Sequence, residues 1–197
     1  MSDPTRSFDI GTLGGAEPAV APTKPERRPV PSNGSADIGL LLLRIVIGGL
    51  FFAHGAQKVF GLWGGLGITR TTENIARHGF TGYAGALAWA TGVTELVAGA
   101  FLVLGLLTPL AAAALLSIKI VAIVVKWGVP FFAAAAPDAL EIDLLLGAGA
   151  AALVFTGAGR VALDNGRTWQ RRPLPYAWLF LVVGVGAALV VLLVLRS

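Results

Sequence analysis

Four polar side chains interrupt an apolar segment near the start of this chain. The segment, residues 43–61, reads LRIVIGGLFFAHGAQKVFG and carries Arg44, His54, Gln57 and Lys58. Imidazole and ammonium groups can donate hydrogen bonds to a carbonyl oxygen, and an imidazole can move protons near neutral pH. A stretch of roughly 20 apolar residues is long enough to cross a bilayer, where ionisable groups mark a functional site or a structural pairing. The pattern therefore predicts either a functional site or a structural pairing within a membrane.

The composition supports a membrane location. The 197 residues are 55% hydrophobic and 13% charged, with a mean hydropathy of +0.76, far more apolar than an ordinary soluble domain. The 26 glycines suit close packing of helices in lipid. The absence of cysteine excludes disulfide relays, iron–sulfur ligation and covalent c-type haem attachment. The net charge of +4 reflects loop topology in such a protein, so no nucleic-acid partner is expected.

Five apolar stretches predict an all-α membrane protein. They cover residues 38–60, 83–107, 110–125, 139–155 and 176–195. The connection at 61–82 predicts a short capped helix beginning after Thr71 or Thr72. Residues 128–137 contain two prolines and are interpreted as an interfacial loop. Residues 1–37, rich in Pro, Gly, Ser and Ala, are predicted to be a polar tail that cannot form a core by itself.

The distribution of basic residues predicts the orientation, because Lys and Arg in short loops favour the cytoplasmic side. One side carries Lys24, Arg27, Arg28, Arg160, Arg167, Arg171 and Arg172. The other carries Arg70, Arg77 and Arg196, with Lys58 and Lys126 at the ends of spans. The N-terminus is therefore predicted to lie in the cytoplasm and the C-terminus outside.

Two groups of polar side chains are predicted at different depths. Counting about 1.5 Å of rise per residue places Arg44, Glu95 and Lys119 at a similar depth, where they could meet as a buried cluster. The second group, near the outer side, consists of His54, Lys58, Lys126, Glu141 and Asp143. In this group the two acidic residues could pair with Lys126, or they could form an acidic patch for a partner.

Three sets of residues, taken together, resemble a known family. The first is Leu43-Arg44 with Gly48, followed by His54-Gly55 and Lys58; the second is Glu95 with Gly99 and the GLLTP turn; the third is Thr156-Gly-Ala-Gly-Arg160 with Leu163-Asp164. These residues lie within 38–165 and resemble the DoxX family of small bacterial membrane proteins.

The resemblance implies a four-helix transmembrane bundle over residues 38–165, in the plasma membrane of a bacterium. To this bundle the chain adds the tail at 1–37 and, at 166–197, a basic loop and a fifth C-terminal transmembrane helix. The small residues of that helix, Gly184, Gly186, Ala187 and Ala188, would either complete the bundle or dock another membrane protein. DoxX-like relatives include quinone-reducing membrane subunits of thiosulfate oxidation, and others appear as membrane partners of respiratory or redox enzymes.

The candidate cofactor-binding residues are Arg44, His54, Lys58 and Glu95, with quinone as the candidate cofactor. Arg44 and Glu95 could instead form a structural ion pair, and His54 could be a structural histidine at the interface. No catalytic residue or metal site is predicted, because the two histidines match no familiar ligand spacing.

Three functions remain open at this point. The first is an accessory or assembly subunit of a respiratory or other redox membrane complex, with no independent catalytic activity and with lipids and that complex as partners. The second is a quinone-coupled oxidoreductase subunit of the thiosulfate:quinone type. The third, a small transporter, is disfavoured because the sequence shows no internal repeat.

Overall fold

The computed structural model describes residues 33–132, 134 and 139–196, apart from the side chain of Arg171. Most of the predicted polar tail and the second half of the predicted interfacial loop therefore lie outside the described residues. Residues 128–132 form no helix, which agrees with the loop predicted there.

The described residues are helical and contain no β-strand, as the sequence predicts. The elements are α1 (Gly34–Phe60), the 3-10 turn η2 (Leu62–Gly64), α2 (Gly67–Arg77), α3 (Ala84–Leu104), α4 (Thr108–Val125), α5 (Leu140–Thr156), α6 (Thr168–Arg171) and α7 (Pro173–Val194). Within this part of the chain, α1, α3, α4 and α7 are long and apolar enough to cross a membrane. Helix α5 has 17 residues, which is at the lower limit for a spanning helix.

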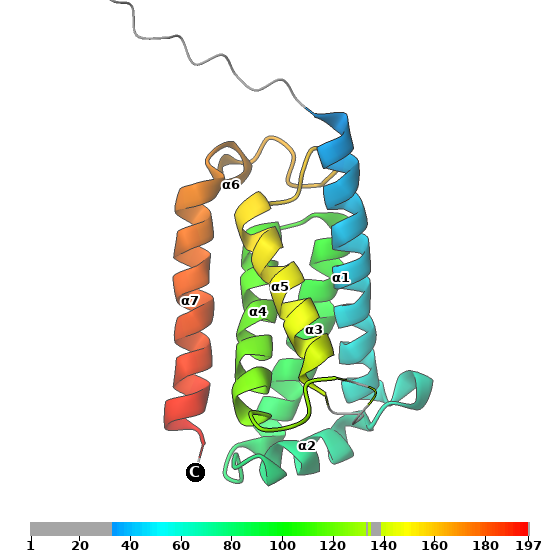
Figure 1. Cartoon of the computed structure of the whole chain (residues 1–197), viewed down its shortest axis with the longest axis vertical. Helices are drawn as coiled ribbons and strands as arrows, with labels where there is room; N and C mark the ends of the chain where they lie inside the picture. The colour runs from blue at the N-terminus through cyan, green and yellow to red at the C-terminus, as the bar shows by residue number, and fades with distance from the viewer. Residues whose placement is uncertain (1–32, 133, 135–138, 197) are drawn as a thin grey trace, which may run out of the picture. The chain divides into compact units, whose positions relative to one another are not determined.

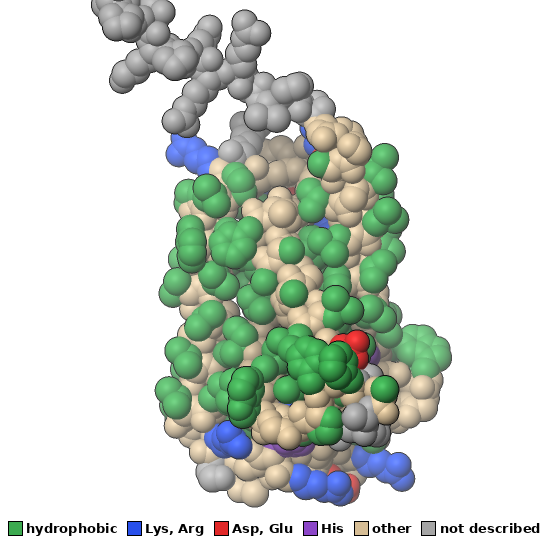
Figure 2. Space-filling view, in the orientation of Figure 1, with side chains coloured by type: hydrophobic (Ala, Val, Ile, Leu, Met, Phe, Trp, Pro, Cys, Tyr) green, Lys and Arg blue, Asp and Glu red, His purple; other side chains and the backbone are tan. Residues whose placement is uncertain are grey.

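The five long helices stand side by side and alternate in direction, while α2 lies across their lower end (Figure 1). Helix α3 packs on α1 and α4, and α4 also packs on α5 and α7. Hydrophobic side chains cover most of the height of the helices, and Lys and Arg side chains lie near the two ends (Figure 2). This distribution is typical of a bundle surrounded by lipid.

Glycines set the register between α1 and α3. A Cβ atom on Gly48 would lie 2.7 Å from the carbonyl oxygen of Gly99, and one on Gly55 would lie 2.8 Å from that of Gly92. No side chain fits at these distances, so the two backbones are in direct contact. Arg44 is consequently level with the C-terminal end of α3, and Lys58 is level with its N-terminal half.

Two helices begin earlier than the sequence suggests. Helix α1 starts at Gly34 rather than at residue 38, because the side chain of Asn33 accepts a hydrogen bond from the backbone N–H of Ser35 at 3.1 Å. Helix α2 starts at Gly67, so the prediction of a start after Thr71 or Thr72 is wrong. The Thr72 hydroxyl donates to the Ile68 carbonyl oxygen at 2.9 Å, as threonines inside a helix do.

The fifth spanning helix, α7, packs against the rest of the chain through part of its small-residue face. Gly184 and Ala188 are buried, and a Cβ atom on Gly184 would lie 2.7 Å from the carbonyl oxygen of Ala113 on α4. Gly186 has no described atom within 4 Å of its Cβ position. Two of the four small residues therefore complete the bundle and are not free to dock a partner.

Candidate functional site

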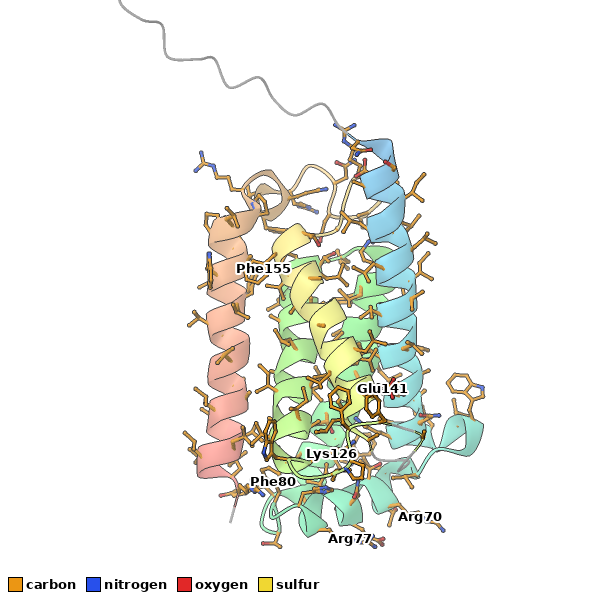
Figure 3. All side chains as sticks on the ribbon, viewed as in Figure 1. Arg70, Arg77, Phe80, Lys126, Glu141 and Phe155 are labelled. Carbon is orange, nitrogen blue, oxygen red and sulfur yellow. The ribbon has the colours of Figure 1, made fainter. Side chains whose placement is uncertain are left out.

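A cavity of about 800 Å³ runs along most of α4, from Lys126 at the lower end of the bundle, where α2 lies, up to Leu110. Apolar residues of α3, α4 and α7 form much of its wall, and polar residues gather at one end. We call this the polar end; its charged and imidazole side chains are His54 and Lys58 from α1, His78 after α2, Lys119 and Lys126 from α4, and Asp143 from α5. Figure 3 shows Lys126 and Phe80 at the end of the molecule where α2 lies, and Phe155 at the opposite end.

Asp143 joins two lysines of the neighbouring helix. Its Oδ1 accepts a hydrogen bond from Lys119 Nζ at 2.8 Å, and its Oδ2 accepts one from Lys126 Nζ, also at 2.8 Å. Asp143 and Lys119 are buried, and the Lys119 ammonium lies 5.3 Å from the centre of the Phe51 ring. Both carboxylate oxygens are thus used, and the pairing fixes the start of α5 against the end of α4.

Lys58 forms the third ion pair of the polar end. Its Nζ donates to Glu95 Oε1 at 2.6 Å, which links α1 to α3. Glu95 is completely buried, whereas the Lys58 side chain is 32% exposed and lines the cavity. The other carboxylate oxygen, Glu95 Oε2, has no hydrogen-bond partner among the described residues. Lys58 therefore lies between a buried carboxylate and the cavity.

His54 lies one helical turn before Lys58 and also lines the cavity. It is half-buried, and no described residue forms a hydrogen bond with its ring. The other histidine of the chain, His78, is at the end of α2, where its Nδ1 donates to the Asn74 carbonyl oxygen at 2.8 Å. Both ring nitrogens of His54 are thus available to a ligand, whereas one nitrogen of His78 is already used.

The charges of the polar end do not cancel. Its three lysines face two carboxylates, Glu95 and Asp143, which leaves one net positive charge beside the His54 imidazole. Buried lysines near an apolar space can stabilise an oxygen atom that carries or gains negative charge. The site is therefore suited to hold a molecule with carbonyl or oxyanion groups at one end and apolar surface elsewhere.

The predicted pairing of Arg44 with Glu95 is wrong. Arg44 is completely buried near the opposite end of the bundle, where it donates from Nη1 to the Leu102 carbonyl oxygen at 3.4 Å and from Nη2 to that of Val161. Glu95 instead pairs with Lys58. Depth counted from loop boundaries missed this arrangement, because the glycine contacts between α1 and α3 place Arg44 about two turns above Glu95.

One other predicted contact among the charged residues is confirmed, and the remaining residues lie elsewhere or have other partners. Lys126 and Asp143 pair as one of the alternatives proposed, and Lys119 joins them instead of joining Arg44. Glu141 is exposed at the start of α5. Of the four candidate cofactor-binding residues, the structure places His54 and Lys58 on the cavity and Glu95 behind Lys58. Arg44 belongs to a different part of the molecule.

Sequence reasoning did not assign a role to Asp164. This buried residue follows α5, and its carboxylate accepts hydrogen bonds from the backbone N–H groups of Leu107 at 2.9 Å and Thr108 at 2.8 Å. It therefore caps the N-terminus of α4. An acidic residue shortly after a predicted helix, in a loop facing the 105–109 turn, was the only sequence signal for this contact.

The ion pair between Lys58 and Glu95 predicts that substitutions at these two residues are energetically coupled. Lys58→Met and Glu95→Gln should together cost less stability than the sum of the two single changes, since each single change leaves one member of a buried pair alone. Arg44→Met and Glu95→Gln should be additive within about 0.5 kcal/mol, because the two sites share no partner. Thermal unfolding in detergent measures both cycles, and coupling between Arg44 and Glu95 would contradict the assignment.

The apolar helices and the cavity with its charged end define a small multi-pass membrane protein. Its internal cavity is lined in part by α7. Comparison with known families shows that the chain belongs to the DoxX family, whose sequence model matches residues 39–127. The chain is 33% identical to "Putative oxidoreductase CatD" of Bacillus subtilis (strain 168) over 133 residues, which are 67% of this chain and 89% of that protein. No solved structure matches the chain significantly.

Proposed function

We propose that this chain is a quinone-binding membrane subunit of a redox complex. The cavity is the observation that carries the proposal, because it combines apolar walls with a polar end that holds His54, Lys58 and Lys119. Its volume of about 800 Å³ is typical of sites for small organic molecules, in which a few polar groups fix the orientation. The name of the Bacillus subtilis relative, "Putative oxidoreductase CatD", supports a redox role.

The polar end has the donors that a quinone head group requires. A quinone is a flat apolar ring whose carbonyl oxygens only accept hydrogen bonds, while ammonium groups and an imidazole N–H donate them. His54 has no partner among the described residues, so its ring can donate to a carbonyl oxygen. Lys58 and Lys119 keep Nζ hydrogens beyond those given to their carboxylates, and their charge favours the oxygens of a reduced quinone.

A bound quinone would carry two electrons and two protons when it is reduced to the quinol. We propose that the electrons come from a redox protein associated with this subunit in the membrane. His54 would give or take one of the two protons at a ring oxygen, because an imidazole can both donate and accept, and water at the outer side of the membrane would supply or take up the other. The loop charges predict that the polar end lies toward the outer side of a bacterial plasma membrane.

An accessory or assembly subunit of a respiratory or redox complex is the second candidate. The observation that favours it is that all three ion pairs are already complete within the chain. Ion pairs that only hold helices together would have this geometry, and the cavity would then contain lipid. The two candidates differ in whether the polar end binds a quinone.

His54 substitutions separate the two candidates. The full chain, extracted from its native membrane in mild detergent, should retain quinone, and His54→Leu should lower that content about tenfold, the effect of losing one hydrogen bond to a buried group. His54→Gln has a similar size and keeps a donor, so it should retain most of the quinone. Quinone content is measured by extraction and mass spectrometry. Equal content in wild type and His54→Leu would contradict the quinone site and favour the accessory role.

A further inference from the structure

The cavity is longer than a head group needs. Along α4 its lining runs from Lys126 to Leu110, which at 1.5 Å of rise per residue is about 24 Å. Above Lys119 the lining is apolar except for Ser117, and it continues to Leu110 over about 13 Å. We call this upper part the apolar arm. It is continuous with the polar end, so one molecule can occupy both.

The cavity is open toward lipid between α3 and α7. Both helices pack on α4, and α4 therefore forms the floor of the arm. Ala90 of α3 and Val183 and Ala187 of α7 line the cavity and are also exposed on the surface of the bundle. A residue that both lines a cavity and is exposed lies at its rim, so the arm can be entered sideways from the bilayer.

We infer that the ligand of this site is an amphiphile with an apolar tail, which lies along α4 beside α7 while the head occupies the polar end. This inference rests on the proposed quinone site and adds the tail and the route of entry. Transfer of a tail from lipid into protein brings little hydrophobic gain, because lipid is equally apolar. The arm therefore acts through shape, and α7, which lies outside the residues matched by the family model, sets which tails fit.

Two neighbouring valines of α7 provide a matched test. Val183 lines the apolar arm and is 56% exposed, whereas Val182 is 68% exposed and lies about 100° further round the helix, away from the arm. Val183→Trp would place an indole in the arm, where added bulk must displace a tail. Val182→Trp adds the same side chain on a lipid-facing surface. Both changes leave the polar end intact.

The experiment uses two photoreactive quinones on the full chain in lipid nanodiscs. One carries the reactive group on the ring and the other carries it at the end of a decyl tail, and labelled residues are mapped by mass spectrometry. The ring probe should label residues of the polar end, and the tail probe should label residues near Leu110 and Phe180. Val183→Trp should lower tail-probe labelling of α4 about tenfold, and Val182→Trp should leave it unchanged.

The outcomes separate the two proposals. If the ring probe does not label the polar end, the proposed function fails and the tail inference fails with it. If the ring probe labels the polar end but the tail probe labels only outward-facing residues such as Val182, the tail inference alone is overturned. Labelling of the arm by a photoreactive phospholipid that excess quinone does not displace would assign the arm to ordinary lipid and also overturn the inference.

Discussion

Asp143→Ala is expected to destabilise the folded protein more than the loss of any other single polar side chain of the cavity. It removes the carboxylate that Lys119 and Lys126 share at 2.8 Å each. Breaking a buried ion pair from one side costs about 3–5 kcal/mol, because the remaining charge is left without compensation. We expect the melting temperature in detergent to fall by about 10 °C or more.

A second substitution tests the reason for this loss. Lys119→Met removes the more buried of the two lysines, so Asp143→Ala with Lys119→Met should be more stable than Asp143→Ala alone. Glu73→Ala, at an exposed position of α2, is the control for loss of a carboxylate and should change the melting temperature by only a degree or two. A double variant that is less stable than Asp143→Ala would contradict the shared-carboxylate account.

Asp164→Ala is expected to have the second largest effect, at the other end of the bundle. The change leaves the backbone N–H groups of Leu107 and Thr108 without the carboxylate that accepts from them. Each unsatisfied group costs about 1–3 kcal/mol when it is buried, and the turn between α3 and α4 has Leu107 at a positive φ of 47°, which needs support from its surroundings. We expect a loss of about 2–4 kcal/mol, measured by thermal unfolding.

The neighbouring residue provides the control for this prediction. Asn165 is exposed and follows Asp164 directly in the same loop, so Asn165→Ala tests the effect of a changed loop without the cap. It should alter stability by less than about 0.5 kcal/mol. If both variants melt at the wild-type temperature, the Asp164 carboxylate does not hold the α3–α4 turn.

The number and class of the helices could be predicted from the sequence because they depend on local properties. Long apolar stretches and the Gly-Leu-Leu-Thr-Pro turn mark the spanning helices without any knowledge of their neighbours. Helix starts were less accurate, since the cap from Asn33 and the back-bonded hydroxyl of Thr72 follow from side-chain geometry. The error is about one helical turn for α1 and about one and a half turns for α2.

The contacts among the charged residues could be predicted only in part. Lys126 follows the end of α4 and Asp143 is near the start of α5, the next helix along the chain. Two residues that flank the same loop lie at a similar depth, so this pair could be predicted from the sequence. The partner of Arg44 depends on the register of α1 against α3, which Gly48 and Gly55 fix through backbone contact. The cavity was not predicted at all, because its upper wall depends on how α7 packs on α4 through Gly184.

The central claim is that the polar end of the cavity binds a quinone head group, and a crystal structure of the protein grown in a quinone-doped lipidic mesophase tests it most directly. We expect density for a quinone ring in the cavity, with one carbonyl oxygen within hydrogen-bond distance of His54 and of Lys58 or Lys119. Acyl-chain density filling the polar end in the same crystals, with no ring beside His54, would contradict it.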